Sequence, residues 1–257
     1  MEHSIFQRIE NANKLDFGDI LSKSIELFKK VWEQALYHCL ITIAVTIPIV
    51  IAIYIPYIIF IFSMTGHRSF NFSHGYEYYD QPEITTYLPL LILYVFVAFV
   101  LLIIVQALSY GIIAHFFKVL KKVDTGSSED IGGYFDLIQK NFNKLFILSV
   151  TTFGIGFIAV LACYFPIFYV MVPLKIMVVI YAFHPEMSVS DIVKASFKLG
   201  NKFWLIIFGL IIISSLLAQL GILFCFVGLL FTAFFVHIPI YYVYKDAIGI
   251  DEVSEKN

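Results

Sequence analysis

Long apolar runs alternate with short polar segments along most of this chain. A helix needs about 20 mostly apolar residues to cross a bilayer. Runs that meet this length cover residues 34–63, 87–117, 146–164, 166–183, 203–220 and 221–244. Very short turns separate the third run from the fourth and the fifth from the sixth, which predicts antiparallel hairpins. The pattern predicts an all-α, polytopic membrane protein of about six transmembrane helices, folded as a single domain.

A mixed polar and apolar segment precedes each predicted hairpin, and the three segments align without gaps over residues 19–32, 133–146 and 191–204. Apolar residues recur in them at helical spacing with Lys and Glu between, which is typical of a helix that lies in the membrane interface. Each copy ends on a Lys and, two residues later, an aromatic residue, a pair that anchors helices among lipid headgroups. These anchors are Lys30 and Trp32, Lys144 and Phe146, and Lys202 and Trp204.

The alignment predicts three repeats, each an interfacial amphipathic helix followed by a transmembrane hairpin. The repeats cover about residues 16–122, 128–184 and 188–246. Structural repeats tend to pack against like units, so we expect the three copies to share one core.

Positive charge is distributed unevenly between the two sides of this topology. Residues 1–33, 118–144, 184–202 and 245–257 carry nearly every Lys and Arg, whereas residues 64–86 carry only Arg68. Lys and Arg are retained on the cytoplasmic side of membrane proteins. We therefore expect both termini in the cytoplasm and residues 64–86 to form an external loop.

Composition agrees with a membrane protein and excludes some other classes. The chain is 60% hydrophobic and 14% charged, against roughly 45–50% apolar and about 25% charged residues in soluble domains. The net charge of −2 gives no basic signal for nucleic acid. The three cysteines stand in apolar runs without a CxxC motif, so we expect no disulfide framework.

The third interfacial segment resembles a known family. Asp191, the stretch 195–202 and Trp204 are similar to the recurrent element of bacterial six-helix membrane proteins related to the YciC-like proteins. A similar element occurs in the membrane domain found beside some glycerophosphodiester phosphodiesterases. The resemblance implies a six-helix fold in the bacterial inner membrane and no settled activity. The soluble phosphodiesterase barrel is absent from this chain, which argues against a hydrolase.

Lys175 is the most unusual residue of the predicted spans. It stands near the middle of the fourth span, where a charge costs a few kcal/mol and usually faces the protein interior. The predicted spans hold no Asp or Glu to pair with it. Two interpretations remain: a Lys that reaches the interface or caps carbonyls freed by Pro173, or a contact with a lipid or a partner protein.

Histidines raise the question of a metal site. His38, His115, His184 and His237 stand near the inner ends of four different spans, and four imidazoles can bind iron or copper. No HxxxH or HxxH spacing places two of them on one helix face, so we favour interfacial or helix-bonded histidines. No phosphate loop, Ser-His-Asp set or CxxC site is recognisable. We expect no catalytic residue, no cofactor and no metal.

The predicted external loop is rich in aromatic residues. Tyr76, Tyr78 and Tyr79 stand among mixed charges, a composition found both at binding surfaces and in loops that lie on outer headgroups. These tyrosines and Lys175 are our candidates for contacts with lipids or partners.

Two functions follow from these features. The first is a non-enzymatic accessory or scaffold subunit that assembles with other integral membrane proteins. The alternative is a lipid-binding or transport-like membrane protein, favoured by Lys175 and by the family resemblance.

Overall fold

The computed structural model describes residues 5–65, 84–224 and 227–250. The regular structure in these ranges is entirely helical. Six of the helical segments described are long and apolar enough to cross a membrane. The chain is thus an all-α, multi-pass membrane protein, as its apolar pattern predicts.

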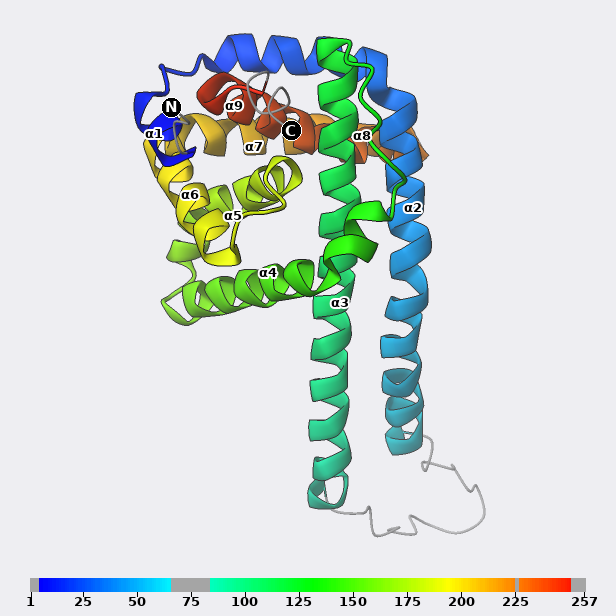
Figure 1. The fold of residues 1–257 in the computed structure, drawn as a ribbon. Helices are drawn as coiled ribbons and strands as arrows, with labels where there is room; N and C mark the ends of the chain where they lie inside the picture. The colour runs from blue at the N-terminus through cyan, green and yellow to red at the C-terminus, as the bar shows by residue number, and fades with distance from the viewer. Residues whose placement is uncertain (1–4, 66–83, 225–226, 251–257) are drawn as a thin grey trace, which may run out of the picture.

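The first predicted interfacial helix and the first predicted span form one helix, α2 (Phe17–Thr65). Figure 1 shows its first part running across the top of the molecule and the remainder descending beside α3 (Ile84–Thr125). No Gly or Pro stands between residues 19 and 47 to end the helix, so the expected boundary is only a bend. α1 (Ile5–Asn11) precedes this bent helix.

α3 is longer at both ends than the span predicted over residues 87–117. It begins inside the segment expected to be an external loop, and it ends at Thr125, so its last turns carry the cationic residues Lys118, Lys121 and Lys122. The outer parts of α2 and α3 expose large apolar side chains on all faces, among them Phe62 and Phe96. Such helices require a lipid environment.

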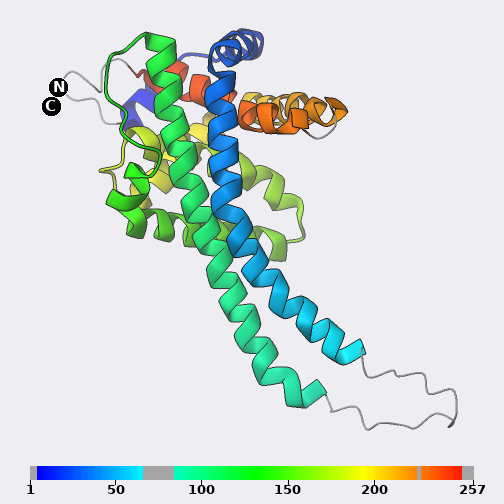
Figure 2. The same ribbon diagram turned by 90° about the vertical axis from the view of Figure 1, so that its right-hand side faces the viewer.

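The remaining helices run crosswise to this hairpin. α4 (Asp136–Leu161) crosses α3, and α7 (Trp204–Gln219) and α8 (Val227–Thr232) cross α2, in both views (Figures 1 and 2). α4 turns back into α5 (Phe165–Phe183) through a sharp bend in which Cys163 and Tyr164 have positive φ. The three hairpins diverge from a shared core and do not form a parallel bundle.

The fourth and fifth spans match their predicted bounds closely, whereas the sixth is Val227–Ile248 and is shifted toward the C-terminus. One helix was expected over residues 221–244. In the structure the 3-10 segment η1 (Leu220–Phe224) comes first, and the span consists of α8, the 3-10 segment η2 (Ala233–His237) and α9 (Ile238–Ile248) in direct succession. Pro239 stands in the first turn of α9, where its missing N–H costs nothing. α6 (Val189–Lys202) is the separate amphipathic helix that the third repeat predicts.

The first and third predicted repeats bury corresponding positions. With the offset that aligns Asp19 with Asp191, each buried residue from Ile20 to Cys39 has a buried counterpart. These buried pairs are Ile20 and Ile192, Ser24 and Ser196, Leu27 and Leu199, Val31 and Phe203, Ala35 and Ile207, His38 and Leu210, and Cys39 and Ile211. A repeat predicts this agreement, but the threefold repeat itself stays a prediction.

Candidate functional site

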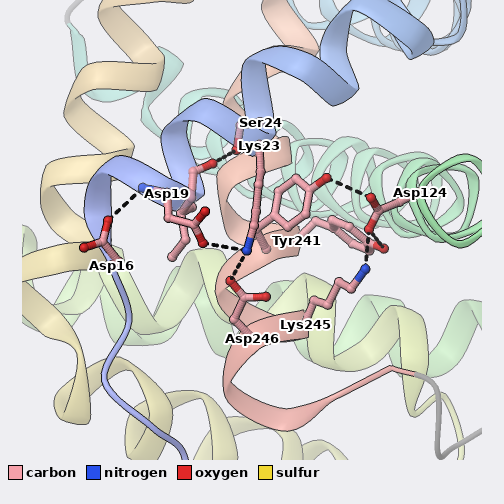
Figure 3. Close-up of polar contacts among 10 residues, drawn as sticks. Asp16, Asp19, Lys23, Ser24, Asp124, Tyr241, Lys245 and Asp246 are labelled. Atoms are coloured by element: carbon pink, nitrogen blue, oxygen red, sulfur yellow. Dashed lines mark hydrogen bonds and ion pairs between the residues drawn. The ribbon is translucent and has the colours of Figure 1, made fainter.

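A polar network joins the end of α3 to α9 (Figure 3). The Asp124 carboxylate accepts hydrogen bonds from the hydroxyls of Tyr241 and Tyr242, both at 2.9 Å, and from Lys245 Nζ at 2.7 Å. The Asp124 and Lys245 side chains are only 16% and 28% exposed. Charge-assisted bonds in such surroundings are stronger than bonds between neutral groups, so the network fixes the end of α3 against α9.

A second group of contacts attaches the first turns of α2 to the same helix. Lys23 Nζ lies 2.5 Å from the Asp19 carboxylate and 3.6 Å from that of Asp246 on α9. Asp16 caps α2, because its Oδ1 accepts the Asp19 N–H at 2.7 Å. These side chains meet between the two helices in Figure 3. The ends of α2, α3 and α9 therefore have fixed relative positions.

A cavity of about 440 Å³ lies beside this junction, at the ends of α3 and α5. Ligand sites in proteins commonly have volumes of about 300–1,000 Å³. Its wall combines charged, polar and apolar residues: Lys118, Lys121, Lys122, Ser127, Glu129, Asp130, Ile131, Ala182, Phe183, Pro185, Glu186, Tyr244 and Ile250. The loop after α3 closes one side, and residues close to the ends of α5 and α9 form the other.

The anionic groups of the cavity already have partners. Lys121 Nζ donates to Glu129 Oε2 at 3.0 Å. Asp130 Oδ1 accepts the Gly132 N–H at 3.0 Å, and Glu186 Oε1 lies 3.3 Å from His184 Nδ1. Each carboxylate thus has a local donor.

Two of the three lysines in the cavity wall have no such partner. Across residues 5–65, 84–224 and 227–250, neither Lys118 nor Lys122 makes a hydrogen bond or an ion pair. The two residues are four positions apart on α3, a spacing that places side chains about 5–6 Å apart on one helix face. The cavity therefore presents two adjacent ammonium groups that make no direct contact with a described carboxylate, although Glu129 and Asp136 act on Lys118 at longer range.

Tyr244 and His184 hold the opposite wall in place. His184 Nε2 lies 2.8 Å from the Tyr244 hydroxyl, and the Phe183 ring stacks on Tyr244 with 5.0 Å between centroids. Burial lowers the pKa of His184, while the nearby Glu186 carboxylate acts in the opposite direction. A neutral imidazole can act as both donor and acceptor, so it suits a positional role for His184.

Lys175, the most unusual residue in the sequence, does not line this cavity. It stands on α5 beside the buried Pro173 and Ile176, but its own side chain remains exposed. It has no hydrogen bond or ion pair to any described residue, and it lies within electrostatic range of His237. Neither a carbonyl cap nor a partner contact is assigned to it.

The predicted anchors have different local contacts. Lys202 Nζ donates to the carbonyls of Ile9, Glu10 and Ala12 at 2.9, 2.6 and 2.9 Å, so it closes the carboxyl end of α1. Lys144 donates to the Pro185 carbonyl.

The aromatic anchors also have individual surroundings. Trp204 Nε1 donates to the Tyr169 carbonyl at 3.2 Å. Trp32 is 42% exposed and tilts against a ring of α8. Phe146 lies beside Phe142, and Lys30 is exposed. The predicted sites Tyr76, Tyr78 and Tyr79 lie outside the described residues.

Replacing Lys202 by Met should loosen α1 against α6, where the ion pair between Lys198 and Glu10 remains. The substitution removes the donor to three carbonyls and keeps most of the apolar side chain. We expect amide hydrogen exchange in residues 5–12 to rise at least about tenfold, because local unfolding then costs less. Lys194→Met is the matched control, because Lys194 is 67% exposed and among the described residues its ion pair is with Asp191. Equal exchange in the two variants would show that Lys202 does not hold α1.

The structure brings two of the four inner histidines together. His38 and His115 are in direct hydrogen-bond contact, and the Phe234 ring contacts the rings of both His38 and His237. No group of three or more His, Cys, Asp or Glu side chains in the described ranges has the arrangement of a metal site.

Sequence reasoning treated the lysines at the end of α3 only as markers of topology. A further signal was available, because their spacing of three and four residues places Lys118 on one helix face with Lys121 and Lys122. The opposing wall comes from Glu186 and Tyr244, which no local pattern links to α3.

Comparison with protein-family models, curated proteins and solved structures found no match to this chain.

Proposed function

We propose that this membrane protein binds a phosphate-bearing lipid headgroup in the cavity at the ends of α3, α5 and α9. The observation that carries the proposal is the pair of unpartnered ammonium groups, Lys118 and Lys122, one helical turn apart on the cavity wall. A phosphate has several acceptor oxygens and can bridge two such groups with charge-assisted bonds. The proposal involves binding and no chemical reaction.

The position of the cavity favours a lipid as the source of the phosphate. Phe183, Ile250 and Ala182 provide apolar surface next to the lysines, as an acyl or glycerol group requires. The cavity also lies where the apolar helix α5 ends. Basic pockets between transmembrane helices on the cytoplasmic side recognise anionic headgroups, and we place this end of the molecule in the cytoplasm because of its lysine content.

Competition between lipids in native mass spectrometry tests the proposal. Purified protein is exchanged into mixed micelles of phosphatidylglycerol and diacylglycerol, which differ in the phosphate-bearing headgroup. We expect the wild-type protein to retain phosphatidylglycerol. In the double variant Lys118→Ala/Lys122→Ala the affinity for this lipid should fall about ten- to hundredfold. The matched control is Lys29→Ala/Lys194→Ala, which removes equal charge from exposed positions.

Each outcome separates one explanation from another. Equal losses in the two double variants would reduce the effect to general surface charge and contradict the cavity. Displacement of the lipid by millimolar inorganic phosphate would identify a free anion as the ligand. We expect the wild-type protein to retain phosphatidylglycerol in the presence of millimolar inorganic phosphate. We expect Lys118→Ala/Lys122→Ala to lose this lipid.

A second proposal is the accessory or scaffold subunit. The observation that favours it is the outer α2–α3 hairpin, which extends beyond the other helices with apolar side chains such as Ile59 and Leu90 exposed. A partner helix could cover that surface. Extraction in a mild detergent should then recover a second membrane protein at near-equal amount, and recovery of the chain alone would oppose this function.

A further inference from the structure

His38 on α2 and His115 on α3 face each other in the core of the protein. His38 Nε2 lies 2.8 Å from His115 Nδ1. The two residues are only 0% and 4% exposed. The contact therefore lies away from bulk water.

The outer nitrogen of each ring meets a backbone carbonyl. His38 Nδ1 lies 2.6 Å from the Gln34 oxygen, and His115 Nε2 lies 3.2 Å from the Gly132 oxygen. A carbonyl oxygen only accepts hydrogen bonds, so each outer nitrogen must carry a hydrogen.

The number of hydrogens is then insufficient for two neutral rings. A neutral imidazole carries one N–H, and both are used by the carbonyls. The two inner nitrogens would face each other with lone pairs at hydrogen-bond distance. Three hydrogen bonds require three hydrogens, whereas two neutral imidazoles supply two.

We infer that His38 and His115 form a proton-binding site, in which one additional proton is shared between His38 Nε2 and His115 Nδ1. The proton-bound pair carries one positive charge and satisfies all three contacts. When the proton leaves, one contact must break, and the longest is the bond to Gly132, in the loop between α3 and α4. The inference does not rest on the proposed lipid cavity, although Lys118 of that cavity acts electrostatically on His115.

Aromatic rings surround the pair. The Tyr134 ring centroid lies 4.9 Å from that of His38 and 4.8 Å from that of His115, and the Phe116 and Phe234 centroids lie 5.0 and 5.8 Å from that of His38. Burial disfavours a charged imidazole. The two carbonyl oxygens oppose that cost, because they accept hydrogen bonds from the charged rings.

Charged and titratable groups reach the pair from three further directions. Asp136 on α4 favours a positive charge at His115, and Lys118 on α3 opposes it. His237 of η2 interacts electrostatically with His38 and with Lys175 of α5. A charge on His237 would therefore compete with the proton of the pair, and Lys175 opposes a charge on His237.

A metal ion does not fit between the inner nitrogens. Zinc binds imidazole nitrogen at about 2.0–2.1 Å, so two ligands need about 3.3 Å or more between them. The observed 2.8 Å suits a shared proton.

Nitrogen NMR of ¹⁵N-histidine-labelled protein in lipid bilayers tests the inference. The direct signature is a ¹⁵N–¹⁵N coupling across the hydrogen bond between the inner nitrogens, with both outer nitrogens carrying hydrogen. We expect that pattern at the acidic end of a titration from about pH 8 to about pH 5. As the pH rises, both rings should lose this ¹⁵N pattern together, in one step that releases one proton.

Variants assign the signal, and other results would overturn the inference. His115→Gln should abolish the coupling, whereas His237→Gln should preserve it. Two rings that titrate in separate steps would oppose a shared proton, as would rings that stay neutral throughout. The wild-type spectrum alone decides the question if His115→Gln does not fold, because only this described histidine pair is in hydrogen-bond contact.

Discussion

Replacing Gly221 by Leu should destabilise the protein by about 3 kcal/mol or more, which is at the upper end of overpacking effects. A Cβ at Gly221 would lie 2.6 Å from the carbonyl carbon and oxygen of Gly228 and 2.5 Å from Thr232 Oγ1. The backbone atoms cannot rotate away as a side chain can. Thr232 also bonds to the Ala218 carbonyl at 2.5 Å, so the close approach holds the end of α7 against α8. Thermal unfolding in detergent measures the loss.

Gly154→Leu provides the matched control for this effect. Gly154 lies in α4, and a Cβ there would meet no atom within 4 Å. We expect a change below about 1 kcal/mol, because the substitution adds exposed apolar surface without a clash. Similar melting temperatures for the two variants would show that α7 and α8 do not approach each other at Gly221.

Replacing Asp124 by Ala should remove about 3 kcal/mol of stability. The change leaves Lys245 and the hydroxyls of Tyr241 and Tyr242 without their shared acceptor. Breaking a buried charge pair by removing one partner costs about 3–5 kcal/mol, and we take the lower end because Lys245 is partly exposed. Unfolding in a denaturing detergent series measures the difference.

Glu129→Ala is the comparison for the charge pair. Glu129 also pairs with one lysine, but its side chain is 55% exposed. Exposed pairs contribute about 0–1 kcal/mol. If Asp124→Ala costs no more than Glu129→Ala, the end of α3 is not held by the network in Figure 3.

The length of an apolar run predicted a span well where a proline or a polar segment marks the ends of that span. The fourth span was expected over residues 166–183 and is α5 (Phe165–Phe183). Pro166 favours a helix start, and the polar segment after Phe183 ends the apolar run. The third amphipathic helix was likewise readable, since Ser188 caps it by accepting the Asp191 N–H at 3.1 Å.

Features that depend on tertiary approach were not readable. α2 has helix-forming residues throughout its bend, so the pattern could not show that two predicted helices are one. The sixth apolar run begins with the 3-10 segment η1 before the span Val227–Ile248, and the close approach of Gly221 to Gly228 is invisible to hydropathy.

The candidate sites illustrate the same limit. Lysines four residues apart on α3 are a local signal. Lys118 and Lys122 make no ion pair because the carboxylates of the cavity contact other donors, and the sequence does not show those contacts. His38 and His115 were weighed as two of four metal ligands, because the sequence contains no information on the 2.8 Å contact that joins them.

Electron cryomicroscopy of the protein in phosphatidylglycerol nanodiscs tests the central claim, phosphate binding in the cavity, most directly. The account predicts phosphate density within about 3 Å of Nζ of both Lys118 and Lys122, continuous with a glycerol group along Phe183. A cavity filled by protein side chains, or Lys118 and Lys122 paired with carboxylates of this chain, would contradict it.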